Sequence, residues 1–343
     1  MQQWIKAVGT GKVGSRDLTY DEAVAAAHAI SRGEVTDAQV GAFLMALRMK
    51  GETHDEIMAF VDVFRKYSLP FASYSDSLNC AGPYDGRNYF PITIPVSLLL
   101  ASVGFPQVLH GAESLPPKLG TSLKELLTGL GVHLDMNVNI WERIFVENHV
   151  GFIWSEKTCK PLELIRHIRE EISLRTLVNT VEKVINPIQS INMIIGVNHK
   201  TTMQHLVNIL PKAGFHTSYI VQGIEGSEDL PIYKTSPLRK VTNWGDESSV
   251  VDPDLFGFQS QPLEKITKEK QIQLLLRTIQ GDESPDIQAE RDHIIFNAGL
   301  RLFWFDRVSS FEEGFMLARQ LYRRKEGNRV LQRWKELSLS VFS

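Results

Sequence analysis

Cysteine is scarce in this sequence. Cys80 and Cys159 are the two cysteines among 343 residues, which argues against a disulfide framework and favours a reducing, cytoplasmic setting. Excess charge of one sign is also small, since the formal net charge is −3. The chain as a whole therefore has no attraction to nucleic acid or to an anionic membrane, and any polyanion site has to be a local patch.

Long apolar runs are missing as well. The most apolar stretch, residues 90–106, is too short to span a bilayer and is interrupted by proline. The first residues, MQQWIKAVGTGKVG, lack the charged-then-apolar order of a signal peptide. We therefore expect a soluble, cytoplasmic protein with no membrane partner.

The first seventy residues predict three short helices that follow one another closely. Thr19-Tyr-Asp-Glu22, Thr36-Asp-Ala-Gln39 and Thr53-His-Asp-Glu56 each have the form of a capping box. Apolar residues recur at helical spacing after each of them. Gly33 and Gly51 stand where helix ends favour glycine.

After residue 70 the pattern changes to short apolar runs separated by helix-length segments, which favours βα units and a mainly parallel sheet. The expected strands are 107–109, 151–154, 193–197 and 218–222, and the helices between them include 121–131 and 201–214. Residues 225–262 are the least regular stretch, which is typical of a functional or mobile loop. Helices are expected to close the chain, at 266–279, 288–305 and 311–334.

Residues 80–91, CAGPYDGRNYFP, raise a question of function. Two glycines let the backbone approach a ligand closely, so the loop can hold a phosphate through its N–H groups. Pro-Tyr-Asp-Gly is equally good turn chemistry with no function attached. The local sequence leaves both interpretations open.

Several motifs, in the same order along nearly the whole chain, resemble the anthranilate phosphoribosyltransferase family, a family of tryptophan biosynthesis, and its paralogues. The motifs include GEVTDAQVGAFLMALRMKGETHDEI (33–57), LHG (109–111), VGFIW (150–154), RHIREEISLRTLVN (166–179), NP (186–187), VQGIEGSED (221–229) and FNAGLRL (296–302). The resemblance implies an α/β fold with a small all-α N-terminal domain and a mainly parallel sheet flanked by helices, like that of the class II nucleoside phosphorylases and phosphoribosyltransferases. The expected domains are 1–74 plus roughly 160–184 for the helical part, and 75–159 plus 185–343 for the α/β part.

The resemblance also implies an activity. Members of the family are glycosyltransferases that move a phosphoribosyl group from phosphoribosyl pyrophosphate to an aromatic amine with Mg²⁺, and they are usually homodimers. The acceptor site would include Arg169, His110 and Gly111. Arg169 is suited to bind a carboxylate, because its planar guanidinium group can donate two parallel hydrogen bonds.

Several residues that bind the phosphoribosyl donor in the family are replaced in this sequence. Phosphate-binding residues carried over from the family are Gly82, Asp85, Gly86, Arg87, Thr93 and Lys118, and the metal pair is Glu228 and Asp229, in reversed order. Pro83 has no N–H to donate, and Leu109 stands where the family has its pyrophosphate lysine. We therefore do not expect efficient transfer to anthranilate.

A second hypothesis is a paralogue that has lost catalysis and binds nucleic acid or a nucleotide. Residues 318–336 are rich in arginine and lysine with interleaved aromatic residues, a pattern that can contact phosphates. The same pattern is typical of a solvated face of an amphipathic helix. Lys118 would be a further contact under this hypothesis.

Overall fold

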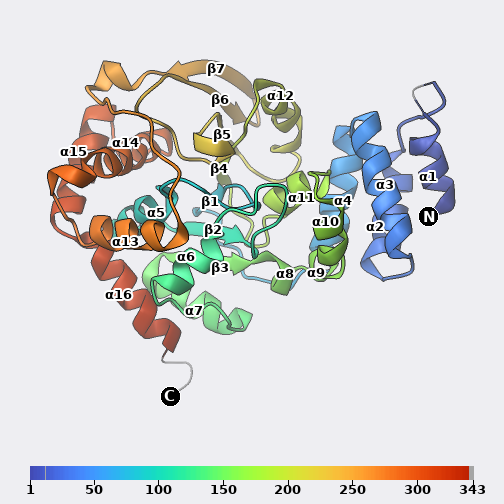
Figure 1. The fold of residues 1–343 in the computed structure, drawn as a ribbon, viewed down its shortest axis with the longest axis horizontal. Helices are drawn as coiled ribbons and strands as arrows, with labels where there is room; N and C mark the ends of the chain where they lie inside the picture. The colour runs from blue at the N-terminus through green and yellow to red at the C-terminus, as the bar shows by residue number, and fades with distance from the viewer. Residues whose placement is uncertain (12, 340–343) are drawn as a thin grey trace.

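The computed structural model describes residues 1–11 and 13–339, and it opens with a helical domain (Figure 1). The helices of this domain are α1 (Gln2–Gly9), α2 (Tyr20–Ser31), α3 (Asp37–Lys50) and α4 (His54–Lys66). Thr19, Thr36 and Thr53 each cap a helix, and the residue three positions later bonds back to the cap, so all three expected capping boxes are confirmed.

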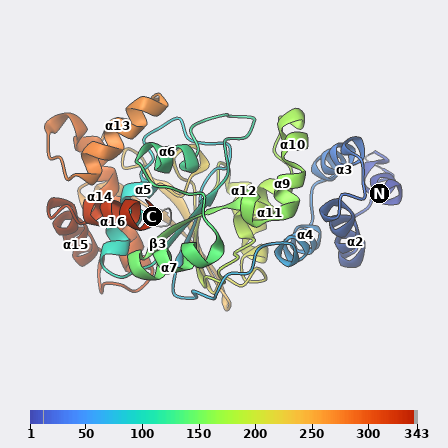
Figure 2. The ribbon, with the colours of Figure 1, turned by 90° about the horizontal axis from the view of Figure 1, so that it is seen from below.

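Four short helices from the middle of the chain return toward this domain. They are α8 (Ser155–Thr158), α9 (Lys160–Leu164), α10 (Arg166–Ile172) and α11 (Val178–Val184). Helix α9 contacts α2, α10 contacts α3 and α11 contacts α4. Both views place α9–α11 between the first helices and the sheet (Figures 1 and 2).

The remaining chain forms an α/β domain around one seven-stranded sheet, in the order β3-β2-β1-β4-β5-β6-β7. The strands are β1 (Leu78–Ala81), β2 (Gln107–Gly111), β3 (Val150–Trp154), β4 (Asn192–Gly196), β5 (Thr217–Val221), β6 (Ser236–Thr242) and β7 (Gly245–Val251). The first five run parallel, and β6 and β7 add an antiparallel edge. The expected fold class is confirmed.

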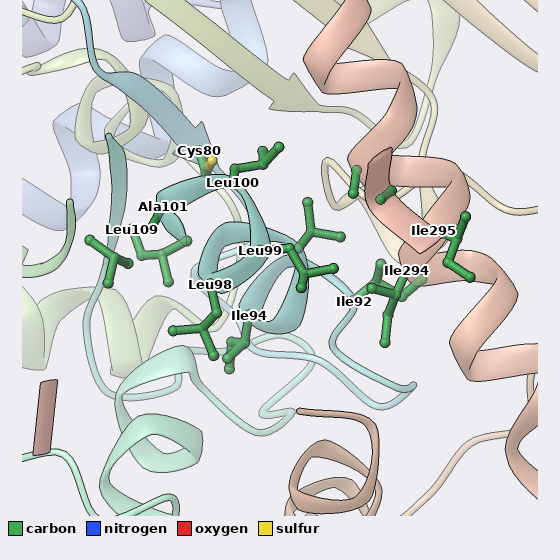
Figure 3. Close-up of a cluster of buried hydrophobic side chains, with 14 of the residues drawn as sticks. Cys80, Ile92, Ile94, Leu98, Leu99, Leu100, Ala101, Leu109, Ile294 and Ile295 are labelled. Atoms are coloured by element: carbon green, nitrogen blue, oxygen red, sulfur yellow. The ribbon is translucent and has the colours of Figure 1, made fainter. Parts of the chain in front are cut away.

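Helices cover both faces of the sheet. They are α5 (Thr93–Ser102), α6 (Leu123–Gly129), α7 (Val138–Asn148), α12 (Lys200–Ile209), α13 (Lys268–Ile279), α14 (Gln288–Trp304), α15 (Phe311–Arg323) and α16 (Glu326–Leu339), with short 3₁₀ turns at η1 (Ile224–Gly226), η2 (Pro253–Phe256) and η3 (Pro285–Ile287). Helix α5 is apolar on all sides because it is buried on all sides. Figure 3 shows its leucines between Cys80 of the sheet and Ile294 and Ile295 of α14.

Alternate residues of β4 belong to two separate hydrophobic cores. Ile194 points into the core beneath α5, whereas Met193 and Ile195 belong to a second core that also contains Phe60 and Phe64 of α4. Strand periodicity thus lets one strand serve both cores. The hydrophobic core of the helical domain is continuous with one face of the sheet.

Two sequence predictions need correction. Residues 225–262 contain the β6–β7 hairpin, which composition conceals because β7 is a polar, exposed edge strand. Residues 311–334 form parts of two helices, because the chain turns at Lys325, which has φ +59°. The turn brings Gly327 of α16 against Leu98 and Leu99 of α5. Within the described residues, no helix is long and apolar enough to cross a membrane.

We expect Arg65→Met to destabilise the protein, because Arg65 donates hydrogen bonds from α4 to three backbone carbonyls, two at the C-terminal end of α11 and one after α12. The carbonyls are those of Val184 (3.0 Å), Ile185 (2.5 Å) and Ala213 (2.6 Å). Loss of these bonds should lower the free energy of unfolding by about 2–4 kcal/mol, measured by urea denaturation. Arg143→Met, at an exposed position of α7, is the control. Equal midpoints for both variants would contradict this role of Arg65.

Candidate functional site

A cleft of about 550 Å³ lies where the helical domain meets the sheet. Strand β1 has β2 on one side and β4 on the other, so the loops after β1 and β4 leave the sheet at a topological switch point, where open α/β sheets bind ligands. Asp85 follows β1, and Asn198 follows β4. Arg48 of α3 and Lys183 of α11 complete the wall. The cleft is therefore formed by both domains.

The glycines of the 82–87 loop allow close contacts within the chain itself. A Cβ added at Gly82 would lie 2.3 Å from Nη2 of Arg87 and 2.6 Å from Oε2 of Glu228. At Gly86, where φ is +80°, it would lie 2.0 Å from the carbonyl oxygen of Gly120. Both positions thus require glycine even without a ligand.

Residues 114–120 lie over this loop and are bonded to it. The Gly120 N–H donates to the Asp85 carbonyl at 2.9 Å, and Arg87 and Thr121 exchange two backbone hydrogen bonds. Lys118 brings its ammonium 3.1 Å from Glu225 and 3.6 Å from Asp85. The two loops that the sequence assigns to phosphate binding therefore form one unit.

Glu228 and Asp229 lie beneath this unit, and both are buried in contact with arginine. Nη2 of Arg87 lies 3.0 Å from Glu228, and Nη2 of Arg301 lies 3.2 Å from Asp229. Burial opposes ionisation of Glu228, but the two guanidinium groups outweigh it and lower the pKa of Glu228. Burial and the neighbouring charge of Glu228 raise the pKa of Asp229. Arg301 also donates to Thr93 at 3.4 Å, so Thr93 belongs to the same cluster.

His110, at the end of β2, belongs to a buried hydrogen-bond chain. Its Nε2 lies 2.7 Å from Oδ1 of Asn79, and its Nδ1 lies 2.7 Å from the hydroxyl of Tyr84. Burial lowers the pKa of His110 to about 4, so the ring is neutral at pH 7. A neutral ring that donates from Nε2 to Asn79 accepts from Tyr84 at Nδ1. The Ser155 Oγ lies 2.7 Å from the Tyr84 hydroxyl and 3.1 Å from the carbonyl oxygen of Gly111, and because Tyr84 donates to His110, the single Ser155 proton goes either to Tyr84 or to Gly111.

Arg169, expected to grip an acceptor carboxylate, already has a carboxylate beside it. Its Nη1 lies 2.7 Å from Oε2 of Glu182 on α11, and both side chains are almost fully buried, at 5% and 1% exposure. Burial raises the pKa of Glu182, against the opposing effect of Arg169. Glu182 and Tyr84 line the cleft and also a smaller inner cavity of about 20 Å³ that includes His110. Glu182 therefore borders both spaces.

Lys183 is a cleft residue that the sequence analysis missed. Its ammonium lies 3.4 Å from the carbonyl oxygen of Gly196, and among the described residues no carboxylate comes within 4.0 Å of it. Burial lowers the pKa of Lys183 to about 8. No motif marks this lysine in the sequence. Arg175 lies nearby, 2.5 Å from Asp85, and is partly exposed.

The basic residues of 318–336 lie elsewhere. Helices α15 and α16 are at the opposite end of the molecule from the helical domain (Figures 1 and 2). Three of their arginines have acidic partners: Arg323 pairs with Glu283, Arg329 with Glu326 and Arg333 with Glu147. They do not form one groove with Lys118.

Comparison with known proteins identifies the family. Residues 79–326 match the model of the glycosyl transferase family α/β domain, and residues 2–68 match that of its helical bundle domain. Anthranilate phosphoribosyltransferase from Symbiobacterium thermophilum is 29% identical, with 98% of each chain covered. The enzyme of the same name from Stutzerimonas stutzeri is also 29% identical, with 89% of each covered.

Solved structures share the fold. Anthranilate phosphoribosyltransferase from Thermus thermophilus superposes with a TM-score of 0.85 at 22% identity, covering 99% of this chain and 100% of that one. The Saccharomyces cerevisiae enzyme in complex with phosphoribosyl pyrophosphate and Mg gives 0.85 at 16% identity, covering 99% and 98%. The relatives named here are phosphoribosyltransferases, a type of glycosyltransferase. This chain belongs to the glycosyl transferase family that includes the anthranilate phosphoribosyltransferases.

Proposed function

We propose that this protein transfers a phosphoribosyl or related pentosyl group from a pyrophosphate donor to an aromatic acceptor in the interdomain cleft. Transfer breaks the bond between the sugar carbon and the pyrophosphate oxygen, and it forms a bond from that carbon to an acceptor nitrogen. The position of the cleft supports this proposal most, because a switch-point crevice walled by both domains can hold donor and acceptor together.

The donor pyrophosphate needs cations that face the cleft. Lys183 has no carboxylate partner within 4.0 Å among the described residues. Arg175 lines the same space with partial exposure, and Lys118 lies next to it, paired with Asp85 of the cleft wall. We assign the pyrophosphate to these three side chains. Gly82, Gly86, Arg87 and Thr93 have internal partners, and in our proposal they shape the loop. Asp85 holds Arg175 and Lys118 in position.

Magnesium is bound with phosphoribosyl pyrophosphate in the yeast structure. Glu228 and Asp229 have the oxygen donors that Mg²⁺ prefers, but Arg87 and Arg301 already neutralise them. The described part of the chain has no group of three or more His, Cys, Asp and Glu placed to hold a metal ion. The carboxylate pair as arranged does not fit a resident Mg²⁺. We therefore treat Mg²⁺ as part of the donor, chelated by its pyrophosphate, and assign the pair no step.

The side chains support nucleic-acid binding less than they support the proposed transfer reaction. It depended on the basic residues of α15 and α16, and the ion pairs of Arg323, Arg329 and Arg333 supply counter-ions to that surface. Two other expectations from the sequence, a homodimer and a cytoplasmic location, stay predictions.

We expect Lys183→Met to weaken donor binding about tenfold, which corresponds to about 1.4 kcal/mol, because it removes a cleft cation that no described carboxylate pairs with. Calorimetric titration with phosphoribosyl pyrophosphate and Mg²⁺ measures this change. Lys212→Met is the control, since Lys212 pairs with Asp55 on the surface. No binding by the wild-type protein at millimolar donor would refute the proposed function.

Donor affinity should fall as pH rises through about 8. The pKa of Lys183 is about 8 in the free protein, so its ammonium is charged below that pH and neutral above it. The donor phosphates keep their full charge over the same range. Titrations from pH 7 to pH 9.5 should therefore show weakening that Lys183→Met abolishes. An unchanged pH profile in the variant would assign the effect to another group.

A further inference from the structure

We infer that the acceptor is an uncharged ring with N–H donors, and that Glu182 is the residue that excludes an acceptor carboxylate. This inference rests on the proposed function, because it concerns the second substrate of the same cleft. It starts from the Arg169–Glu182 pair. An arginine at this place could bind a carboxylate of the acceptor, but here Glu182 of the same chain supplies that carboxylate.

The charge balance of the pair opposes an anionic acceptor. One guanidinium faces one carboxylate, and both are withdrawn from water. A second carboxylate at Arg169 would place two anions around one cation in a medium of low dielectric constant, where like charges about 4 Å apart repel strongly. We therefore expect an anionic acceptor to bind at least tenfold more weakly than a neutral one of equal shape.

The unused hydrogen-bonding capacity of the Arg169–Glu182 pair favours an acceptor that donates hydrogen bonds. Apart from the contact of Oε2 with Nη1 of Arg169, neither carboxylate oxygen of Glu182 has a hydrogen-bond partner among the described residues, and Nη2 of Arg169 has none there either. Buried polar groups are nearly always hydrogen-bonded, so Glu182 has acceptor capacity that a ligand N–H can satisfy. Because Glu182 lines the cleft, and the inner cavity of about 20 Å³ is too small for a ring, we place the acceptor ring on the cleft side of Glu182.

Apart from Lys183, whose charge lowers the pKa of Glu182, the described residues that line the inner cavity offer an acceptor carboxylate no cation. His110 is neutral, and Tyr84 uses its hydroxyl in the chain with His110 and Ser155. Val108 and Ile153 line the rest of the inner cavity with apolar side chains. Lys183 follows Glu182 directly, but its ammonium lies beside Gly196 on the cleft side, where we place the pyrophosphate.

A matched pair of probes tests the inference. 2-Aminobenzamide and 2-aminobenzoate share a ring and an amine, and they differ in having a neutral amide or a carboxylate. Calorimetry on the full chain saturated with pyrophosphate and Mg²⁺ should show the amide binding at least tenfold more tightly. The Glu182→Gln variant should bind the carboxylate probe, 2-aminobenzoate, at least tenfold more tightly than the wild-type protein does, because Arg169 loses its counter-ion. Glu171→Gln, at an exposed position of α10, should leave both affinities unchanged.

Each outcome separates this inference from the proposed function. Equal affinities of the wild-type protein for both probes, or no binding of the amide, would overturn the inference while pyrophosphate binding still supports the transferase. Absence of pyrophosphate binding would refute the transferase itself. The comparison of probes on the wild-type protein needs no variant, so it decides the question even if Glu182→Gln fails to fold.

Discussion

Three arginines that are buried beside the cleft each have a counter-charge within the chain, and the architecture of the site follows from this pairing. Arg87, Arg301 and Arg169 are each almost fully buried, and each meets a carboxylate within 3.2 Å. A buried charge without a partner costs several kcal/mol. The pairs therefore fix the loops after β1 and β5 relative to one another and to α14, and they fix α10 relative to α11.

The internal pairing changes the meaning of the glycine-rich loop at 80–91. Gly82 gives room to the Arg87–Glu228 pair, and Gly86 gives room to Gly120 in the second loop. The close approach that glycine permits is therefore to the chain's own groups. What faces the cleft is a different set of cations, carried partly by α11.

Helix α11 carries a residue of the buried ion pairs and a cation of the cleft at adjacent positions. Successive side chains on a helix point about 100° apart, so Glu182 turns toward Arg169 and Lys183 toward the cleft near Gly196. The same helix contacts α4, whose Arg65 bonds to the carbonyls at its C-terminal end. Packing of the helical domain thus sets the position of both groups.

The sequence by itself determined the elements with local causes. Capping boxes at Thr19, Thr36 and Thr53 depend on residues three positions apart, so they were predictable. Short apolar runs predicted the parallel strands β2 to β5, but the four-residue strand β1 was missed. Ordered motifs along the whole chain determined the family. Only the tertiary structure decided which charges are neutralised. Arg169 and Glu182 are brought together by helix packing, and Arg87 meets Glu228 from a distant segment, because ion pairing depends on distance in space and leaves no periodic signal in the sequence.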